Sequence, residues 1–255
     1  MHKHKKLQAI GLQVTARIPT AKSKWLGSAA SLVVPAIALA VPMIGVMVDG
    51  AGSPAQALPS CSSTVSGTYS SGLSLVASCN PFTNNGTITN AGGHGITGGN
   101  SAAWTVLNNG TASSSSSYGD GIHLGSLNNT ITNASTGRIN GSSNGMGIYS
   151  FGIATVSNAG TITGGIFGVL VNNDGSINNS AGLISGGNGA SLGGNGTISN
   201  AVGGRISGSY KGVEIYGGGS VANDGRITGG TYGVFFYDGG SLTNTGTIIS
   251  PAFGV

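Results

Sequence analysis

Charged side chains are scarce in this sequence, since Asp, Glu, Lys and Arg make up 6% of its 255 residues, against about 25% in ordinary soluble domains. So little charge excludes a coiled coil and a charged disordered tail, because both depend on ionic side chains. The chain instead holds 49 glycines. Each glycine inside a helix costs about 1 kcal/mol, so a helical bundle is excluded too. The glycines follow no Gly-X-Y period, which excludes collagen.

Basic residues are nearly absent beyond the N-terminal region. Six of the ten Lys and Arg residues precede residue 25, so the formal net charge of +4 belongs to the leader. From residue 58 onward the count is 4 − 5 = −1. A nucleic-acid site needs clustered Lys and Arg, so we expect no nucleic-acid partner. The later charged residues are Arg138, Arg205, Lys211 and Arg226, with Asp120, Asp174, Glu214, Asp224 and Asp238.

The first 57 residues have the three parts of a secretory signal peptide. Residues 1–24 are basic, residues 25–48 are apolar, and the segment ends in the small residues that precede a cut after Ala57. We therefore predict a signal peptide over residues 1–57, export by the Sec machinery through the periplasm, and secretion. The apolar stretch is nearly long enough to span a bilayer, so an uncleaved anchor is the alternative. Pro35 and Pro42 within it favour cleavage.

The chain has only two cysteines, Cys61 and Cys79, and both follow the predicted cut. In an oxidising compartment such an isolated pair most often closes a loop. We therefore predict a disulfide that ties residues 58–81 into an N-terminal segment. Two unpaired thiols are the alternative.

Proline is absent from residues 82–250, and asparagine appears first at residue 80 and then recurs. These changes mark the start of a repeat. Its unit reads apolar-x-Asn, a short bend, Gly-x-Ile-x-Gly, and a glycine-flanked apolar run. The central isoleucine recurs every 21–23 residues, which is the period of a solenoid. The central column is Ile139, Ile162, Ile184, Ile206, Ile227 and Ile248.

Apolar residues alternate within each short piece, as in Val213 and Ile215. A period of two indicates strands with one buried face. Three such strands per turn predict an all-β fold, a single-stranded right-handed parallel β-helix (solenoid) of about eight coils of 21–23 residues over residues 82–255. At about 4.8 Å per coil, the rod is on the order of 40 Å long.

The asparagine of each apolar-x-Asn motif lies two residues after an inward apolar residue. By strand parity it should also face inward, and stacked amides can satisfy one another's donors and acceptors. We therefore predict an interior amide ladder, with eight turn asparagines facing water as the alternative. Asn188, by contrast, is expected to be exposed. The predicted ladder residues are Asn90, Asn108, Asn133, Asn158, Asn179, Asn200, Asn223 and Asn244.

The long basic leader, the Ala-x-Ala cut and the array typified by GSVANDGRITGGTYGVFFYDGGSLTNTGTI resemble a bacterial autotransporter passenger domain. The resemblance implies a surface-exposed β-helix, often an adhesin, exported through an outer-membrane β-barrel translocator. Ten-residue alternating strands with aromatic girdles, which a barrel needs, are absent up to residue 255. We expect a fragment, a truncated gene, or a passenger that is exported by a separate partner.

We therefore expect a structural or adhesive role at the cell surface, toward an unidentified host or neighbouring-cell ligand. No enzymatic activity, cofactor or metal is predicted. The alternative is an enzyme acting on polysaccharide, but Asp174 and Asp238 should lie three coils apart, beyond the carboxylate spacing of glycosidases. Gly-His-Gly around His94 resembles polygalacturonases only weakly, and His94 is interpreted as an exposed bend residue. Asp120 and His123 alone do not make a metal site.

Three further interpretations concern the surface and the chain as a whole. A flat threonine array for ice or crystal binding is disfavoured, because Arg205 and Arg226 interrupt it. A non-functional fragment is another alternative, whose exposed terminal strand would self-associate. Scattered surface tyrosines are favoured over a patch that stacks on sugar or protein. These residues are Tyr149, Tyr210, Tyr216, Tyr232 and Tyr237.

Overall fold

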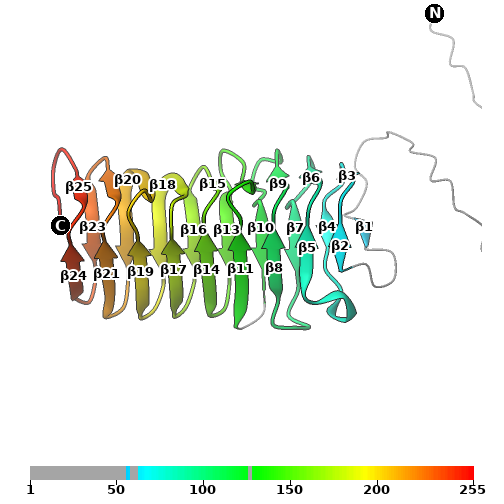
Figure 1. The fold of residues 1–255 in the computed structure, drawn as a ribbon, viewed down its shortest axis with the longest axis horizontal. Helices are drawn as coiled ribbons and strands as arrows, with labels where there is room; N and C mark the ends of the chain where they lie inside the picture. The colour runs from blue at the N-terminus through cyan, green and yellow to red at the C-terminus, as the bar shows by residue number, and fades with distance from the viewer. Residues whose placement is uncertain (1–55, 58–62, 126–127) are drawn as a thin grey trace, which may run out of the picture. The chain divides into compact units, whose positions relative to one another are not determined.

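The computed structural model describes residues 56–57, 63–125 and 128–255. Most of the predicted leader, and Cys61, lie outside the described residues. Within the described part, no helix is both long and apolar enough to cross a membrane. The predicted fold is confirmed, because parallel strands stack into a β-solenoid whose coils follow one another along a single axis (Figure 1).

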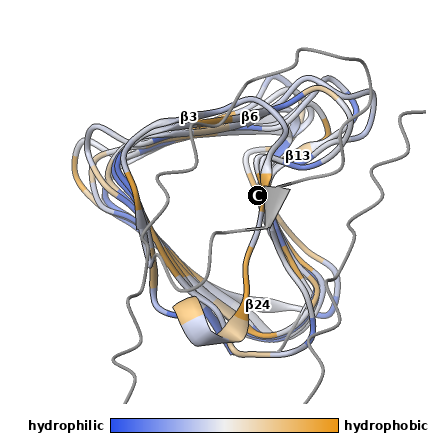
Figure 2. Cartoon of the chain, turned by 90° about the vertical axis from the view of Figure 1, so that its right-hand side faces the viewer, coloured by the Kyte–Doolittle hydropathy of each residue, from blue (hydrophilic) through white to orange (hydrophobic). Residues whose placement is uncertain are grey.

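Each coil has three sides, as the view along the stack shows (Figure 2). We call them the first, second and third face in chain order. The first face is a sheet of nine parallel strands, and the other two faces join into one sheet through the long strands β18 and β20. These two strands bend from the second face onto the third.

The strands of each face lie in parallel register. The first face consists of β2 (Thr64–Val65), β5 (Phe82–Asn84), β8 (Thr105–Asn108), β11 (Asn129–Asn133), β14 (Ala154–Asn158), β17 (Gly175–Asn179), β19 (Gly196–Asn200), β21 (Gly219–Asn223) and β24 (Gly240–Asn244). The second face consists of β3 (Thr68–Tyr69), β6 (Thr87–Asn90), β9 (Thr111–Ser114), β12 (Arg138–Asn140), β15 (Thr161–Thr163), the first parts of β18 (Leu183–Leu192) and β20 (Arg205–Ile215), β22 (Arg226–Gly229) and β25 (Thr247–Ile249). The third face consists of β1 (Gln56–Ala57), β4 (Leu73–Ser74), β7 (Ile96–Gly98), β10 (Ile122–Leu124), β13 (Met146–Ser150), β16 (Phe167–Val171), the second parts of β18 and β20, and β23 (Tyr232–Phe236).

The apolar core is a set of columns, one residue per coil, as the alternation predicted. The six central isoleucines pair in register along the second face, and the first five are buried, whereas Ile248 in the last coil is partly exposed. Ala112 and Ile88 continue this column toward the N-terminus. Stacking like residues in this way buries the apolar side chains, which is the main favourable term in folding.

The solenoid begins earlier than the predicted residue 82. Strands β2, β3 and β4 already form a coil that pairs with β5, β6 and β7. This coil was not predicted because its strands are short and because Val65 stands at the position where the next coil has the motif residue Asn84. Ala57, the last residue before the predicted cut, lies in β1 and pairs with Ser74.

One half of the predicted disulfide, Cys61, lies outside the described residues, so the pairing stays a prediction, and the structure records Cys79 as a free and buried thiol. Cys79 ends a short 3-10 turn, η1 (Ala77–Cys79), and its side chain joins the apolar core cluster. It packs there as a small apolar residue, as buried free cysteines generally do.

A ladder of asparagine amides runs inside the first face. Each amide nitrogen donates to the amide oxygen of the next coil over 2.7–2.8 Å, without a break from Asn84 to Asn244. Seven of the eight predicted residues belong to it, and all but Asn244 are buried. The coil lengths between them are 24, 25, 25, 21, 21, 23 and 21 residues, so the early coils are longer than predicted.

Asn90 was wrongly assigned to this ladder. Its coil has two apolar-x-Asn motifs, Phe82-x-Asn84 and Ile88-x-Asn90, and Asn84 occupies the ladder position. Asn90 ends β6 on the second face, opposite Ser114. There its amide donates to the carbonyl oxygen of His94 and accepts from the backbone N–H of Gly92, so it fixes a bend.

Candidate functional site on the third face

The outer side of the third face carries two positions per coil that flank a glycine and an inward apolar residue. Gly212 shows why glycine stands there, because a Cβ atom on it would lie 2.5 Å from the carbonyl oxygen of Gly233 and 2.6 Å from Ile227 Cγ2. Parallel pairing stacks these positions along the solenoid. In order along the chain the pairs are His94 with Thr97, Asp120 with His123, Met146 with Tyr149, Phe167 with Leu170, Asn188 with Ser191, Lys211 with Glu214, and Tyr232 with Phe235.

Lys211 and Glu214 form a buried ion pair on this face. Their side chains are 6% and 1% exposed, and the ammonium contacts Glu214 Oε1 directly. The other carboxylate oxygen accepts from the amide of Asn188 at 2.8 Å and from Ser191 Oγ at 3.4 Å. Asn188 is therefore not the exposed residue that was predicted, because it is half-buried and tied to this carboxylate. Tyr237 Oη completes the cluster, 3.0 Å from Lys211 Nζ.

Aromatic rings enclose this ion pair and continue to the surface. The Lys211 ammonium lies 4.7 Å from the ring centroid of Phe235, 4.8 Å from that of Tyr237 and 5.2 Å from that of Tyr210, distances at which a cation is attracted by aromatic faces. Tyr216 stacks on Tyr237 with centroids 4.2 Å apart and planes within 7°. These two tyrosines, which we call the tyrosine platform, are 40% and 48% exposed.

Burial and the neighbouring charges shift the ionisation of this cluster. Burial, and then the hydrogen bond with Tyr237, raise the pKa of Tyr216 to about 12, so its hydroxyl stays neutral. Burial acts to lower the pKa of Lys211, but the hydrogen bonds to Glu214 and Tyr237 outweigh it and the pKa rises. Lys211 is therefore a fixed cation that holds the Tyr237 ring in place.

A second polar cluster occupies the same positions two coils from the N-terminal end. His123 Nδ1 lies 2.7 Å and His94 Nδ1 lies 3.2 Å from the same carboxylate oxygen of Asp120. Burial alone would raise the pKa of Asp120, but its contacts with His123 and His94 and the hydrogen bond from the backbone N–H of Met146 lower it to about 2. His94 was predicted to be an exposed bend residue. It instead belongs to this cluster.

The acids weighed for polysaccharide chemistry are not brought together. Asp174 follows β16 and Asp238 follows β23, at exposed corners. The first-face order β17-β19-β21-β24 separates these corners by three coils, roughly 14 Å at the strand spacing. Asp174 Oδ1 instead accepts from the backbone N–H of Asn195 at 2.7 Å. Asp174 and Asp238 are therefore too far apart to act as the pair of catalytic carboxylates that a glycosidase needs.

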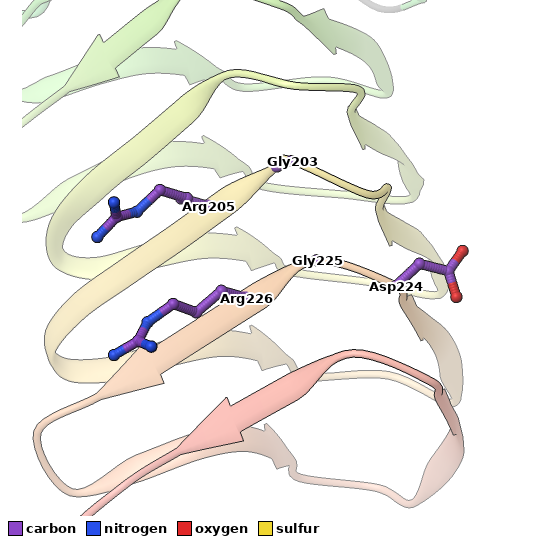
Figure 3. A pocket seen from close by; sticks show the side chains of 6 residues that line it. Gly203, Arg205, Asp224, Gly225 and Arg226 are labelled. Carbon is purple, nitrogen blue, oxygen red and sulfur yellow. The ribbon is translucent and has the colours of Figure 1, made fainter.

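A shallow pocket of about 360 Å³ lies where the first face turns into the second. Arg205 and Arg226 stand opposite each other on paired strands. Figure 3 shows both guanidinium groups extending to one side, while Asp224 points the other way. Asp224 therefore forms no ion pair with either guanidinium group. Among the described residues, neither arginine has an ion-pair partner.

A smaller apolar pocket, of about 220 Å³, lies at the C-terminal end of the third face. Tyr232, Phe235 and Phe253 line it, and Tyr232 stacks on Phe253 with centroids 5.1 Å apart. The aromatic residues therefore form one group that continues from the tyrosine platform to the end of the described chain.

The surface tyrosines were predicted to be scattered. Asp120 and His123 were paired from the sequence, but the addition of His94 and the Lys211–Glu214 pair were not predicted. Four of the five, Tyr210, Tyr216, Tyr232 and Tyr237, gather around Lys211, and Tyr149 stands beside His123 instead. One signal was available, since polar pairs three residues apart flank Gly-apolar in two coils, as Asp-Gly-Ile-His and Lys-Gly-Val-Glu. His94 had no such local signal.

Comparisons with known proteins found no matching family model, no matching curated protein and no matching solved structure.

Proposed function

We propose that this chain is a secreted, cell-surface β-solenoid with an adhesive role, and that its tyrosine platform binds the apolar face of sugar rings. The observation that carries the proposal is the parallel pair of exposed rings on a rigid support. Flat aromatic faces with polar hydroxyl tips suit a ligand that is apolar on its face and polar at its edge. A saccharide ring has this character.

The support beneath the platform favours binding over incidental exposure. Tyr237 is held by Lys211, and Lys211 is held by the buried Glu214. A surface that is already ordered loses little conformational entropy when a ligand binds. Lys211 and Glu214 neutralise each other, and the exposed Asp238 next to Tyr237 in the chain is a remaining carboxylate. These charges favour neutral glycans over acidic ones.

The proposed location rests on the leader and on the resemblance to autotransporter passengers. The basic, apolar and small-residue parts of residues 1–57 support Sec-dependent export to the periplasm. Display on the cell surface would then require an outer-membrane β-barrel translocator, as in that family.

A glycan array probed with the full-length chain tests the binding proposal. We expect Tyr216→Ala to weaken binding to the recognised glycans about tenfold, the loss of one stacking contact of roughly 1.4 kcal/mol, whereas Tyr216→Phe keeps the ring and most of the binding. Tyr118→Ala is the matched control, because Tyr118 is 76% exposed and lies outside the cluster. Failure to bind any glycan, or equal binding by Tyr216→Ala and Tyr118→Ala, would refute the proposal.

A further inference from the structure

We propose that His94, Asp120 and His123 form a binding site for a divalent transition-metal ion of the Zn²⁺ type. The site lies near the N-terminal end of the third face, several coils from the tyrosine platform. One ligating atom from each residue lies within 4.8 Å of the others. The inference is independent of the proposed adhesive function, since it uses none of the same residues.

The solenoid brings the three residues together from two coils. Asp120 and His123 flank Gly121 and Ile122 in one coil, so both side chains stand on the outer side. His94 comes from the preceding coil, where the backbone N–H of Asp120 donates to its Nδ1 at 3.0 Å. The three donors therefore converge although His94 is 26 residues from Asp120 in sequence.

The donor set matches the chemistry of zinc sites. Zn²⁺ is commonly bound by imidazole nitrogen and carboxylate oxygen at about 2.0–2.2 Å, and neighbouring donors around a tetrahedral ion are then about 3.3 Å apart. The two nitrogen–oxygen distances to Asp120, 2.7 and 3.2 Å, are already close to that separation. An ion bound at His94 Nδ1 would replace the hydrogen bond that this nitrogen accepts from the backbone N–H of Asp120.

The surroundings order the ligands before an ion arrives. Asp120 Oδ1 accepts from the backbone N–H of Met146 at 2.8 Å, which leaves Oδ2 toward the histidines. The centroids of the two imidazole rings lie 4.1 Å apart with the planes tilted by 30°, and the Tyr149 ring packs against His123 at 4.9 Å. Such orientation of ligands by hydrogen bonds and packing is typical of metal sites.

Access and charge also fit an ion. Both histidine side chains are 30% exposed, whereas Asp120 is 7% exposed, so an ion can enter from solvent onto a buried carboxylate. A neutral His123 that binds an ion through Nδ1 would carry its ring proton on Nε2. Two neutral imidazoles and one carboxylate would leave one coordination position for water.

The test must separate this site from the other imidazoles and thiols of the chain. His2 and His4 are the only other histidines, and Cys61 is a third potential ligand. A background chain carrying His2→Ala, His4→Ala and Cys61→Ser removes all three, while the remaining thiol, Cys79, is buried in the core. Isothermal titration of this full-length background with ZnCl₂ should then give one bound ion per chain.

Each ligand is next replaced in that background. We expect His94→Ala, His123→Ala and Asp120→Asn to weaken Zn²⁺ binding by at least about 100-fold, because three protein ligands are reduced to two. Asp120→Asn retains the oxygen that accepts from Met146, so it keeps the local fold. Tyr118→Ala serves as the control and should bind as the background does.

Thermal unfolding guards against variants that fail to fold. Zn²⁺ should raise the melting temperature of the background chain, since an ion that binds only the folded state stabilises it, and should leave that of the three ligand variants unchanged. Metal-free melting curves show whether each variant is folded. The proposal is overturned if the background binds no Zn²⁺ at 1 mM (about the limit of weak protein sites), or if folded ligand variants bind it equally well.

Discussion

Replacing one rung of the asparagine ladder should destabilise the solenoid far more than replacing its immediate neighbour. Asn179 is buried in β17, where its amide donates to Asn200 Oδ1 at 2.8 Å and to the carbonyl oxygen of Gly182 at 2.9 Å. Its own oxygen accepts from Asn158 at 2.8 Å. Asn178 lies beside it on the same strand but points outward and is exposed. The two positions therefore differ mainly in what their side chains contact.

The cost of Asn179→Ala follows from the contacts that it removes. Loss of the hydrogen bonds with Asn158 and Gly182 costs about 1 kcal/mol each. The oxygen of Asn200 is then buried without its ladder donor, which costs about 1–3 kcal/mol more. The total is about 4 kcal/mol, which corresponds to roughly 8–16 °C in melting temperature for a folded unit of this size. Asn178→Ala should stay within about 0.5 kcal/mol of the unmodified chain.

Urea unfolding followed by far-ultraviolet circular dichroism measures both variants. A lower midpoint for Asn179→Ala, with an unchanged midpoint for Asn178→Ala, is the expected result. If the two variants unfolded at the same urea concentration, the amide ladder would contribute nothing beyond ordinary strand pairing, and the reasoning would be refuted.

The remaining predictions concern the two polar clusters. Lys211→Met alone should lower the free energy of unfolding in urea by about 3–5 kcal/mol, because it leaves the Glu214 carboxylate buried without its cation. Adding Glu214→Leu should recover most of this loss. A loss under about 1 kcal/mol for Lys211→Met would contradict the prediction. The pKa of Asp120 is lowered from 3.8 to about 2 in the folded chain. Its ionised carboxylate therefore stabilises the folded chain by about 2 kcal/mol above about pH 4. This contribution disappears as the pH falls toward 2. Unfolding free energies of the unmodified chain and Asp120→Asn should converge over that window, and parallel curves would disprove the assignment.

Local spacing made the fold and much of the interior predictable. Period-two alternation decides which way a side chain points within a strand, so Ile184 and Asn200 could both be assigned to the interior before any coil was placed. The repeat period likewise decides that successive coils stack. Prediction was poorest near the N-terminal end, where short strands and longer coils blur the period, and this is why Asn90 and the start of the solenoid were misplaced.

The sequence by itself thus determined the solenoid, its isoleucine column and its amide ladder, because each depends on a pattern repeated within about two dozen residues. Only the tertiary structure decided which outward side chains meet. Coil lengths vary from 21 to 25 residues along the ladder, and this variation sets which residue of one coil lies over which residue of the next. His94 meets Asp120, and Tyr216 stacks on Tyr237, because register across coils brings them together, and no spacing within one coil encodes that register.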